Sequence, residues 1–153
     1  MTGRRLRIAV VGAGFFAQFH HEAWSRLDRV DLVGICDLDR TRADAAALAS
    51  GTQGFDDLDA MLDVTQADVV DIATPPETHL ALVVAVAERS LPVICQKPLA
   101  PTLDEARAIA AAASSAGVTL AVHENFRFQP WFREARRLID AGQLGDLHGI
   151  TFR

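Results

Sequence analysis

Short apolar runs alternate with helix-forming segments along the whole chain. Several runs are apolar almost without interruption, which is typical of strands in a parallel sheet that helices cover on both faces. The alternation therefore predicts an α/β fold, built as a doubly wound, mainly parallel sheet with right-handed crossovers. The expected strands are Leu6–Val11, Leu32–Cys36, Gln53–Phe55, Val69–Ala73, Val93–Cys95, Thr119–Val122 and Gly149–Phe152.

Helix ends are indicated by residues that favour a first or a last turn. Thr102–Glu105 has the spacing of a capping box, and Gly117 is expected to end the helix that this box opens. Pro130 is expected to open another helix and Gly142 to close it. Asp56 is expected to cap the short helix that follows it.

Composition narrows the class of protein. Half of the 153 residues are hydrophobic, the net charge is −5, and the arginines form no basic stripe, so a nucleic-acid partner is not expected. The two cysteines lie far apart and indicate reduced thiols. The apolar run after the N-terminal arginines is broken by Gly12 and Gly14, which argues against a secretory signal. No run is long enough for a membrane helix, and we expect a cytoplasmic protein.

The first expected strand is followed by Gly12-Ala-Gly14-Phe15-Phe16-Ala17, a G-x-G-x-x-A pattern. The first glycine allows a tight turn, and the second lets the backbone approach a pyrophosphate. The small third residue lets the helix pack close to the strand. Between a strand and a helix, this pattern predicts a Rossmann dinucleotide-binding site. The alternative is a glycine turn that only joins the strand to the helix.

The second expected strand ends next to Asp37, at the distance where an acid binds the adenosine ribose hydroxyls. A carboxylate there would repel a 2′-phosphate, which favours NAD over NADP. Arg40 and Arg42 follow closely and could offset that repulsion. The alternative is that Asp37 only caps a helix.

The next strand ends carry further candidates. Thr74 and Pro75 form a stiff turn that could wall a cofactor site, and His79 in the helix that follows is interpreted as structural rather than catalytic. Gln96 and Lys97 follow the fifth strand, and Lys97 is the only lysine in the chain. A compact ammonium can donate to a substrate oxygen and exchange protons, which arginine cannot. The alternative is a solvated surface lysine.

Past the sixth expected strand, Asn125 and Arg127 stand among several aromatic residues. They could contact a polyhydroxylated substrate, or Arg127 could form a structural ion pair. Metal and serine-hydrolase chemistry find no motif: Ser25 stands where H-E-x-x-H would need its second histidine, and there is no C-x-x-C or G-x-S-x-G. No metal is therefore expected.

Taken in order, GAGFFA with His20 behind it, CDLD, TPPETH, QKP and ENFRFQPWFREARRLIDAGQLG resemble the Gfo/Idh/MocA oxidoreductases. The resemblance runs over essentially the whole chain. It implies an NAD(P)-dependent dehydrogenase or reductase that transfers a hydride between nicotinamide and a sugar, cyclitol or related substrate. It also implies a homo-oligomer, and a motif lysine beside the nicotinamide, often followed by a cis peptide bond to proline.

The resemblance assigns roles to residues of this sequence. Lys97 would be catalytic and would bind the substrate with Asn125 and Arg127. Cofactor contacts would come from Gly12, Gly14, Phe15, Phe16, Ala17, Asp37, Thr74, Pro75, His79 and Gln96.

Two departures from the family pattern matter. The motif usually reads Glu-Lys-Pro, whereas Gln96 replaces the acid here. Family members are also roughly twice as long, because a second α+β domain follows the Rossmann domain. We therefore expect a Rossmann domain over residues 1–125 and, over residues 126–153, a connecting helix and the first strand of the second domain. Alone, the chain would be inactive.

Two other functions stay open from the sequence. A non-catalytic module that binds or senses a dinucleotide would explain the length without a further domain. A methyltransferase that uses S-adenosylmethionine shares the glycine turn and the acid after the second strand, but the Lys-Pro step and the G-x-G-x-x-A spacing count against it.

Overall fold

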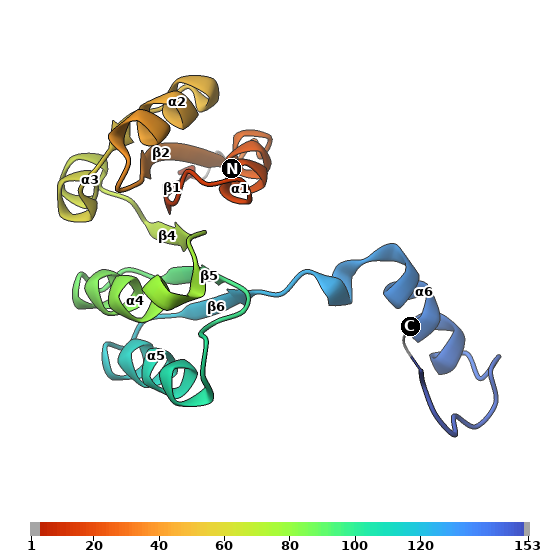
Figure 1. The fold of residues 1–153 in the computed structure, drawn as a ribbon. Helices are drawn as coiled ribbons and strands as arrows, with labels where there is room; N and C mark the ends of the chain where they lie inside the picture. Colours follow the sequence, from red (N-terminus) through yellow and green to blue (C-terminus); the bar gives the residue numbers. More distant parts are fainter. Residues whose placement is uncertain (1–3, 152–153) are drawn as a thin grey trace. The chain divides into compact units, whose positions relative to one another are not determined.

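The computed structural model describes residues 4–151 and divides the chain into two compact units, Met1–His123 and Glu124–Arg153. Unit 1 contains the sheet (Figure 1). Its elements are β1 (Leu6–Val11), α1 (Ala17–Ser25), β2 (Val30–Cys36), α2 (Arg40–Ser50), β3 (Gly54–Phe55), α3 (Leu58–Thr65), β4 (Val69–Ile72), η1 (Pro76–Thr78), α4 (His79–Glu88), β5 (Val93–Gln96), α5 (Leu103–Ser115) and β6 (Leu120–His123).

The six strands form one parallel sheet in the order β3-β2-β1-β4-β5-β6. This is the strand order of a doubly wound dinucleotide-binding fold, and it confirms the predicted fold class. Six of the seven expected strands are present, with bounds that differ by two residues at most. The seventh was expected at Gly149–Phe152. Residues 149–151 form no strand because no other described strand pairs with them, and Phe152 lies outside the described residues.

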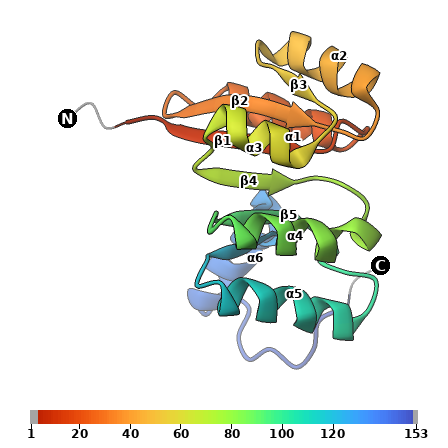
Figure 2. The ribbon, with the colours of Figure 1, turned by 90° about the vertical axis from the view of Figure 1, so that its left-hand side faces the viewer.

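Helices cover both faces of the sheet. Figure 2 shows α3, α4 and α5 in front of it, and their buried side chains, among them Met61, Val86 and Ile109, share one apolar core with Val70 and Cys95 of the strands. On the other face, which we call the α1 face, α1 packs against β1 and β2, with α2 beside it. The core thus has two layers, and side chains alternate between them along each strand.

The sequence signals for helix ends are largely confirmed. Thr102 caps α5 by accepting the backbone N–H of Glu105 at 3.3 Å, and Gly117 follows that helix with φ +68°. The expected cap at Asp56 was wrong by one residue. Asp57 has the extended backbone of an N-cap and accepts the N–H of Ala60 at 2.7 Å, so α3 begins at the next residue.

Both cysteines are free and buried, as the sequence indicated. Burial raises the pKa of the Cys36 thiol to about 11 and that of Cys95 to about 12, because the interior disfavours the thiolate. They behave as small apolar core residues. None of the helices among residues 4–151 has the length and apolar character needed to cross a bilayer.

Unit 2 holds the 3-10 turn η2 (Phe126–Phe128) and α6 (Pro130–Asp140). Pro130 is the first residue of α6, and Gly142 follows its end with φ +67°, as predicted. No side chain of α6 is buried within the described structure.

The core predicts which substitution unit 1 will not tolerate. Ile109 on α5 is 0% exposed, so Ile109→Ala should lower the free energy of unfolding by roughly 2–5 kcal/mol. Leu103→Ala on the same helix is the control, because Leu103 is 65% exposed and its truncation should cost less than about 0.5 kcal/mol. Chemical denaturation followed by circular dichroism measures both; equal losses would contradict the assigned packing of α5.

Candidate functional site

The order of the strands reverses at one point of the sheet, between β1 and β4. The chain leaves β1 toward β2 on one side and β4 toward β5 on the other, and β1 and β4 are hydrogen-bonded neighbours. In doubly wound sheets, ligands bind outside the carboxyl ends of the strands at such a reversal of order. Val11 and Ile72 are paired at that end, so the loops after them are the candidate site.

Gly12 forms the tight turn after β1. Its φ is +115°, and a Cβ added there would lie 2.5 Å from the carbonyl oxygen of Ala73. Its N–H donates to the carbonyl of Cys36 at 2.7 Å. Only glycine satisfies this backbone and this contact, as the first position of the fingerprint requires.

Gly14 has the opposite environment. No heavy atom lies within 4 Å of a Cβ built there, so the backbone is open to a ligand. Two residues further on, Phe16 precedes α1 without any side-chain cap for the first N–H groups of the helix, and Ala17 is fully buried against the sheet. An open backbone beside an uncapped helix N-terminus fits a pyrophosphate.

Asp37 is tied to the glycine loop. Its Oδ2 accepts the N–H of Ala13 at 2.8 Å, and its Oδ1 accepts the N–H of Asp39 at 2.9 Å. The side chain that caps α2 is Asp39, which accepts from the N–H groups of Thr41 and Arg42. The alternative that Asp37 is the helix cap is therefore wrong.

The two arginines near Asp37 are already paired with acids. Arg40 Nε lies 2.9 Å from Asp44 and Arg42 Nε 3.2 Å from Asp39. The hydrogen bond to Asp44 raises the pKa of the Arg40 guanidinium. Their charges are partly neutralised, which weakens the case for a 2′-phosphate site.

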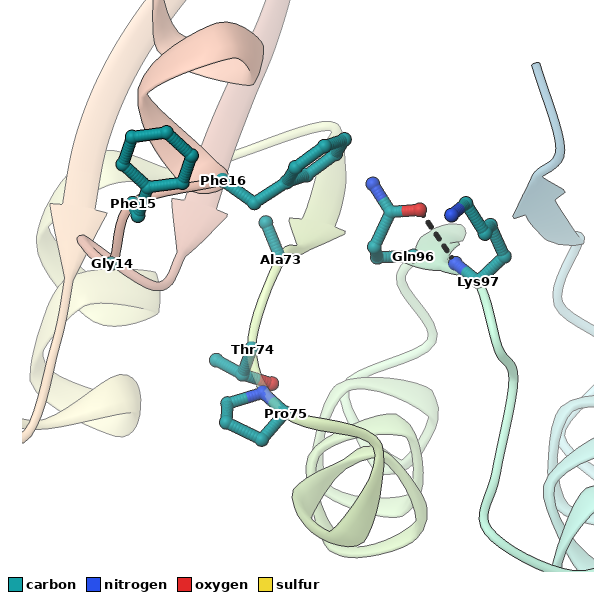
Figure 3. Close-up of a pocket in the computed structure, with 8 residues that line it drawn as sticks. All are labelled: Gly14, Phe15, Phe16, Ala73, Thr74, Pro75, Gln96 and Lys97. Atoms are coloured by element: carbon teal, nitrogen blue, oxygen red, sulfur yellow. Dashed lines mark hydrogen bonds between the residues drawn. The ribbon is translucent and has the colours of Figure 1, made fainter.

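A cavity of about 320 Å³ opens between the loops that follow β1, β4 and β5 (Figure 3). Its volume lies in the range of small-molecule sites. Seven residues that the sequence placed in the site line it, together with Ala73. They are Gly14, Phe15, Phe16, Thr74, Pro75, Gln96 and Lys97.

Lys97 stands at the β5 side of this cavity. Its backbone N–H donates to the side-chain oxygen of Gln96 at 2.7 Å, and the peptide bond between Lys97 and Pro98 is cis. The structure thus brings the glycine loop and the lysine to one cavity, although more than eighty residues separate them in the sequence.

His79 does not reach the cavity. The residue is 0% exposed, and its ring nitrogens lie 2.9 Å from the carbonyl oxygen of Thr74 and 3.0 Å from that of Leu99. It links the Thr74–Pro75 turn to the chain beyond Pro98. The sequence predicted a direct contact between His79 and a cofactor, whereas the structure places His79 under this turn, where it supports the turn's backbone.

His21 supports the glycine loop in a similar way. Its Nε2 lies 3.0 Å from the carbonyl oxygen of Gly12, and burial is the main cause that lowers the pKa of its imidazole. A neutral ring then donates Nε2–H to that carbonyl.

A buried polar group beside the site was missed from the sequence. Asp71 Oδ2 accepts hydrogen bonds from His20 Nδ1 at 2.8 Å and from Trp24 Nε1 at 2.7 Å, and Gln96 Nε2 lies 2.8 Å from His20 Nε2. Asp71 is 0% exposed. A charged residue inside the apolar run VVDIA was the signal that could have revealed it, because an unpaired carboxylate is rarely buried.

The ligand atoms of His20, Asp71 and His123 lie within 4.8 Å of one another. However, both ring nitrogens of His20 already lie in hydrogen bonds. A metal ion would have to displace one of them. The pKa of His123 is lowered, chiefly by burial, so that its ring is held neutral.

Asn125 and Arg127, the other predicted substrate contacts, belong to unit 2. Asn125 precedes the turn η2, and the Arg127 guanidinium carbon lies 5.3 Å from the centre of the Phe128 ring. Their contacts with a substrate stay predictions.

Residues 6–124 match the Gfo/Idh/MocA family, described as an oxidoreductase family with an NAD-binding Rossmann fold. The chain belongs to this family, which confirms the family predicted from the sequence motifs, and NAD is the cofactor of the family's fold.

Among named relatives, a D-apiose dehydrogenase of Paraburkholderia graminis is 43% identical over 145 residues, which are 94% of this chain and 39% of the relative. An inositol 2-dehydrogenase of Saccharopolyspora erythraea is 37% identical, over 95% of this chain and 44% of the relative. The chain thus spans about four tenths of the length of these relatives.

Solved structures show the same partial coverage. An oxidoreductase from Agrobacterium radiobacter in complex with NAD⁺, L-tartaric acid and magnesium matches with a TM-score of 0.86 and 34% identity, over 93% of this chain and 42% of that one. The WlbA dehydrogenase from Bordetella pertussis in complex with NADH and UDP-GlcNAcA matches with a TM-score of 0.85 and 31% identity, over 93% and 44%.

The two glycines should respond differently to the same substitution. Gly12→Ala should lower the free energy of unfolding by roughly 1–3 kcal/mol, because its positive φ and the contact with Ala73 both exclude a Cβ. Gly14→Ala should change it by less than about 0.5 kcal/mol. Urea titration of both variants provides the measurement, and a Gly14→Ala loss as large as that of Gly12→Ala would refute the assigned environments.

Proposed function

We propose that this chain forms the cofactor-binding part of an NAD-dependent dehydrogenase that transfers a hydride between nicotinamide and a hydroxyl or carbonyl carbon of a sugar or cyclitol. The observation that carries the proposal is the cavity that joins the glycine loop of Gly14 to Lys97. The names of the relatives, D-apiose and inositol dehydrogenases, support the substrate class.

Different residues of the chain would bind different parts of the cofactor. The open backbone at Gly14 and the N-terminus of α1 would hold the pyrophosphate, and Asp37 would accept hydrogen bonds from the adenosine ribose. Phe16, Thr74 and Pro75 would form the walls of the nicotinamide end. NAD itself supplies the hydride acceptor when it is bound.

Lys97 would act on the substrate at that end of the cavity. In the oxidation direction its neutral amine would accept the hydroxyl proton, and in the reduction direction its ammonium would orient the carbonyl oxygen by a hydrogen bond and return that proton. Asn125 and Arg127 would add contacts to other hydroxyl groups. A location in the cytoplasm and assembly into homo-oligomers complete the proposal.

Calorimetric titration of the chain with NADH and with NADPH tests the cofactor site first. NADH should bind more tightly, because the carboxylate of Asp37 would repel a 2′-phosphate. Asp37→Asn keeps an acceptor for the N–H of Ala13 but removes the charge, so the preference for NADH should fall by roughly tenfold or more.

Asp28→Asn is the matched control, since it removes the same charge at an exposed position outside the site. Tighter binding of NADPH to the unchanged chain would move the adenosine site to Arg40 or Arg42. Preference for S-adenosylmethionine over both dinucleotides would revive the methyltransferase alternative.

Substitution of Lys97 separates a dehydrogenase from a dinucleotide-sensing module. In the protein expressed from its whole reading frame, Lys97→Met should leave NADH affinity within a few-fold and lower kcat by roughly 10²–10⁴-fold. NADH formation during incubation with NAD and a panel of aldoses and cyclitols gives the rate. Undiminished turnover of the variant would remove Lys97 from the mechanism. Tight NADH binding by the unchanged protein without turnover on any member of the panel would favour the sensing module.

A further inference from the structure

One backbone N–H determines the orientation of the amide of Gln96. The Lys97 N–H can only donate, and it points at Gln96 Oε1 at 2.7 Å. The other end of the amide, Nε2, therefore faces His20 Nε2 at 2.8 Å, and an amide NH₂ can only donate. His20 Nε2 must accept this bond, so it carries no proton.

The proton of His20 is thereby placed on Nδ1. That nitrogen lies 2.8 Å from Asp71 Oδ2, and an ionised carboxylate can only accept. Each group thus donates to the next one, from the backbone N–H of Lys97 through Gln96 and His20 to the carboxylate of Asp71. We call these three side chains, Asp71, His20 and Gln96, the buried chain.

The buried chain is closed to solvent. Asp71 is 0%, His20 3% and Gln96 8% exposed, and the rings of His20 and His123 pack edge to face, with their centroids 4.5 Å apart. Asp71 Oδ1 has no hydrogen-bond partner among the described residues, so Oδ2 carries the bonds from both His20 and Trp24. A misdirected donor here would leave another buried group unsatisfied, at a cost of about 1–3 kcal/mol.

We propose that Gln96 is a positioning residue for Lys97: its amide holds neutral His20 on one side and the backbone of Lys97 on the other, and so fixes the lysine at the cavity through α1 and β4. Because it concerns the role of Lys97, the proposal rests on the function proposed above. A carboxamide has no acid–base group that titrates near neutral pH, so Gln96 cannot pass a proton from His20 to the active-site end.

A glutamate at position 96 would behave differently. An ionised carboxylate could accept from the Lys97 N–H but could not donate to His20. Either the ring takes a second proton on Nε2 or the new carboxyl group keeps its own. In both cases Gln96→Glu brings one titratable proton into the buried chain, which the amide does not.

Nitrogen-15 NMR of the histidine rings in the whole chain tests this without any ligand. In the unchanged protein at neutral pH, His20 should show the Nδ1–H tautomer, and the amide of Lys97 should exchange slowly. In Gln96→Glu, the His20 ring should show the imidazolium pattern, or the ¹³C shift of the new carboxyl should show a protonated acid, while the Lys97 amide stays protected.

Gln96→Met should give the reverse result. The thioether offers Lys97 a far weaker acceptor, so its amide should exchange faster, while His20 keeps the Nδ1–H tautomer through Asp71. Gln53→Glu is the matched control, because it makes the same change at an exposed site and should move neither signal. Unfolding curves confirm that each variant is folded before the spectra are compared.

Kinetics then measure the effect on Lys97. In the protein expressed from its whole reading frame, Gln96→Met should lower kcat by roughly ten- to hundredfold and change NADH affinity by a few-fold at most, because the side chain acts mainly through the lysine. An Nε2–H tautomer of His20 in the unchanged protein would overturn the proposal, as would an ionised carboxyl at position 96 beside an unchanged ring. Failure of the proposed function would appear separately, as absent NADH binding with the NMR results intact.

Discussion

The close contact between Gly12 and the carbonyl of Ala73 is the constraint on which the candidate site depends. It brings the chain that leaves β1 against the chain that leaves β4, at the one place where the strand order reverses. From this contact, the glycine loop turns into α1 on one side and the Thr74–Pro75 turn runs on the other. The cavity lies between them, so its geometry follows from a backbone contact that no side chain could occupy.

A second constraint joins elements that are far apart in the sequence. Asp71 on β4, His20 on α1 and Gln96 on β5 meet on the α1 face of the sheet, where apolar packing would be the ordinary solution. Burying a carboxylate and an imidazole is unfavourable unless each finds a partner. Directional hydrogen bonds then fix the relative placement of these three elements more tightly than apolar side chains could. The carboxyl end of β5, where Lys97 lies, is fixed with them.

The sequence was sufficient for the features that depend on local chemistry. Strand–helix alternation predicted the sheet, and the spacing of Gly12, Gly14 and Ala17 predicted the loop, because each follows from periodicity or from backbone sterics. Features that depend on contacts between residues distant in the sequence were not predictable. The role of Asp71 needs His20, fifty-one residues away. The strand expected at Gly149 needs a neighbour to pair with, and the position of the α3 cap was decided by one residue's backbone.

The two ends of the candidate site carry side chains of opposite charge. Asp37 stands by the glycine loop after β2, and Lys97, the only lysine of the chain, stands at the β5 side of the cavity. The arginines nearest to Asp37 are engaged with Asp44 and Asp39, so their charge does not compete with the acid for a ligand. Position 96, directly before Lys97, carries an amide and no acid. In the proposed function, Lys97 would act on a substrate oxygen without a carboxylate at the preceding position. It would then exchange its proton with substrate or solvent and not with the buried chain.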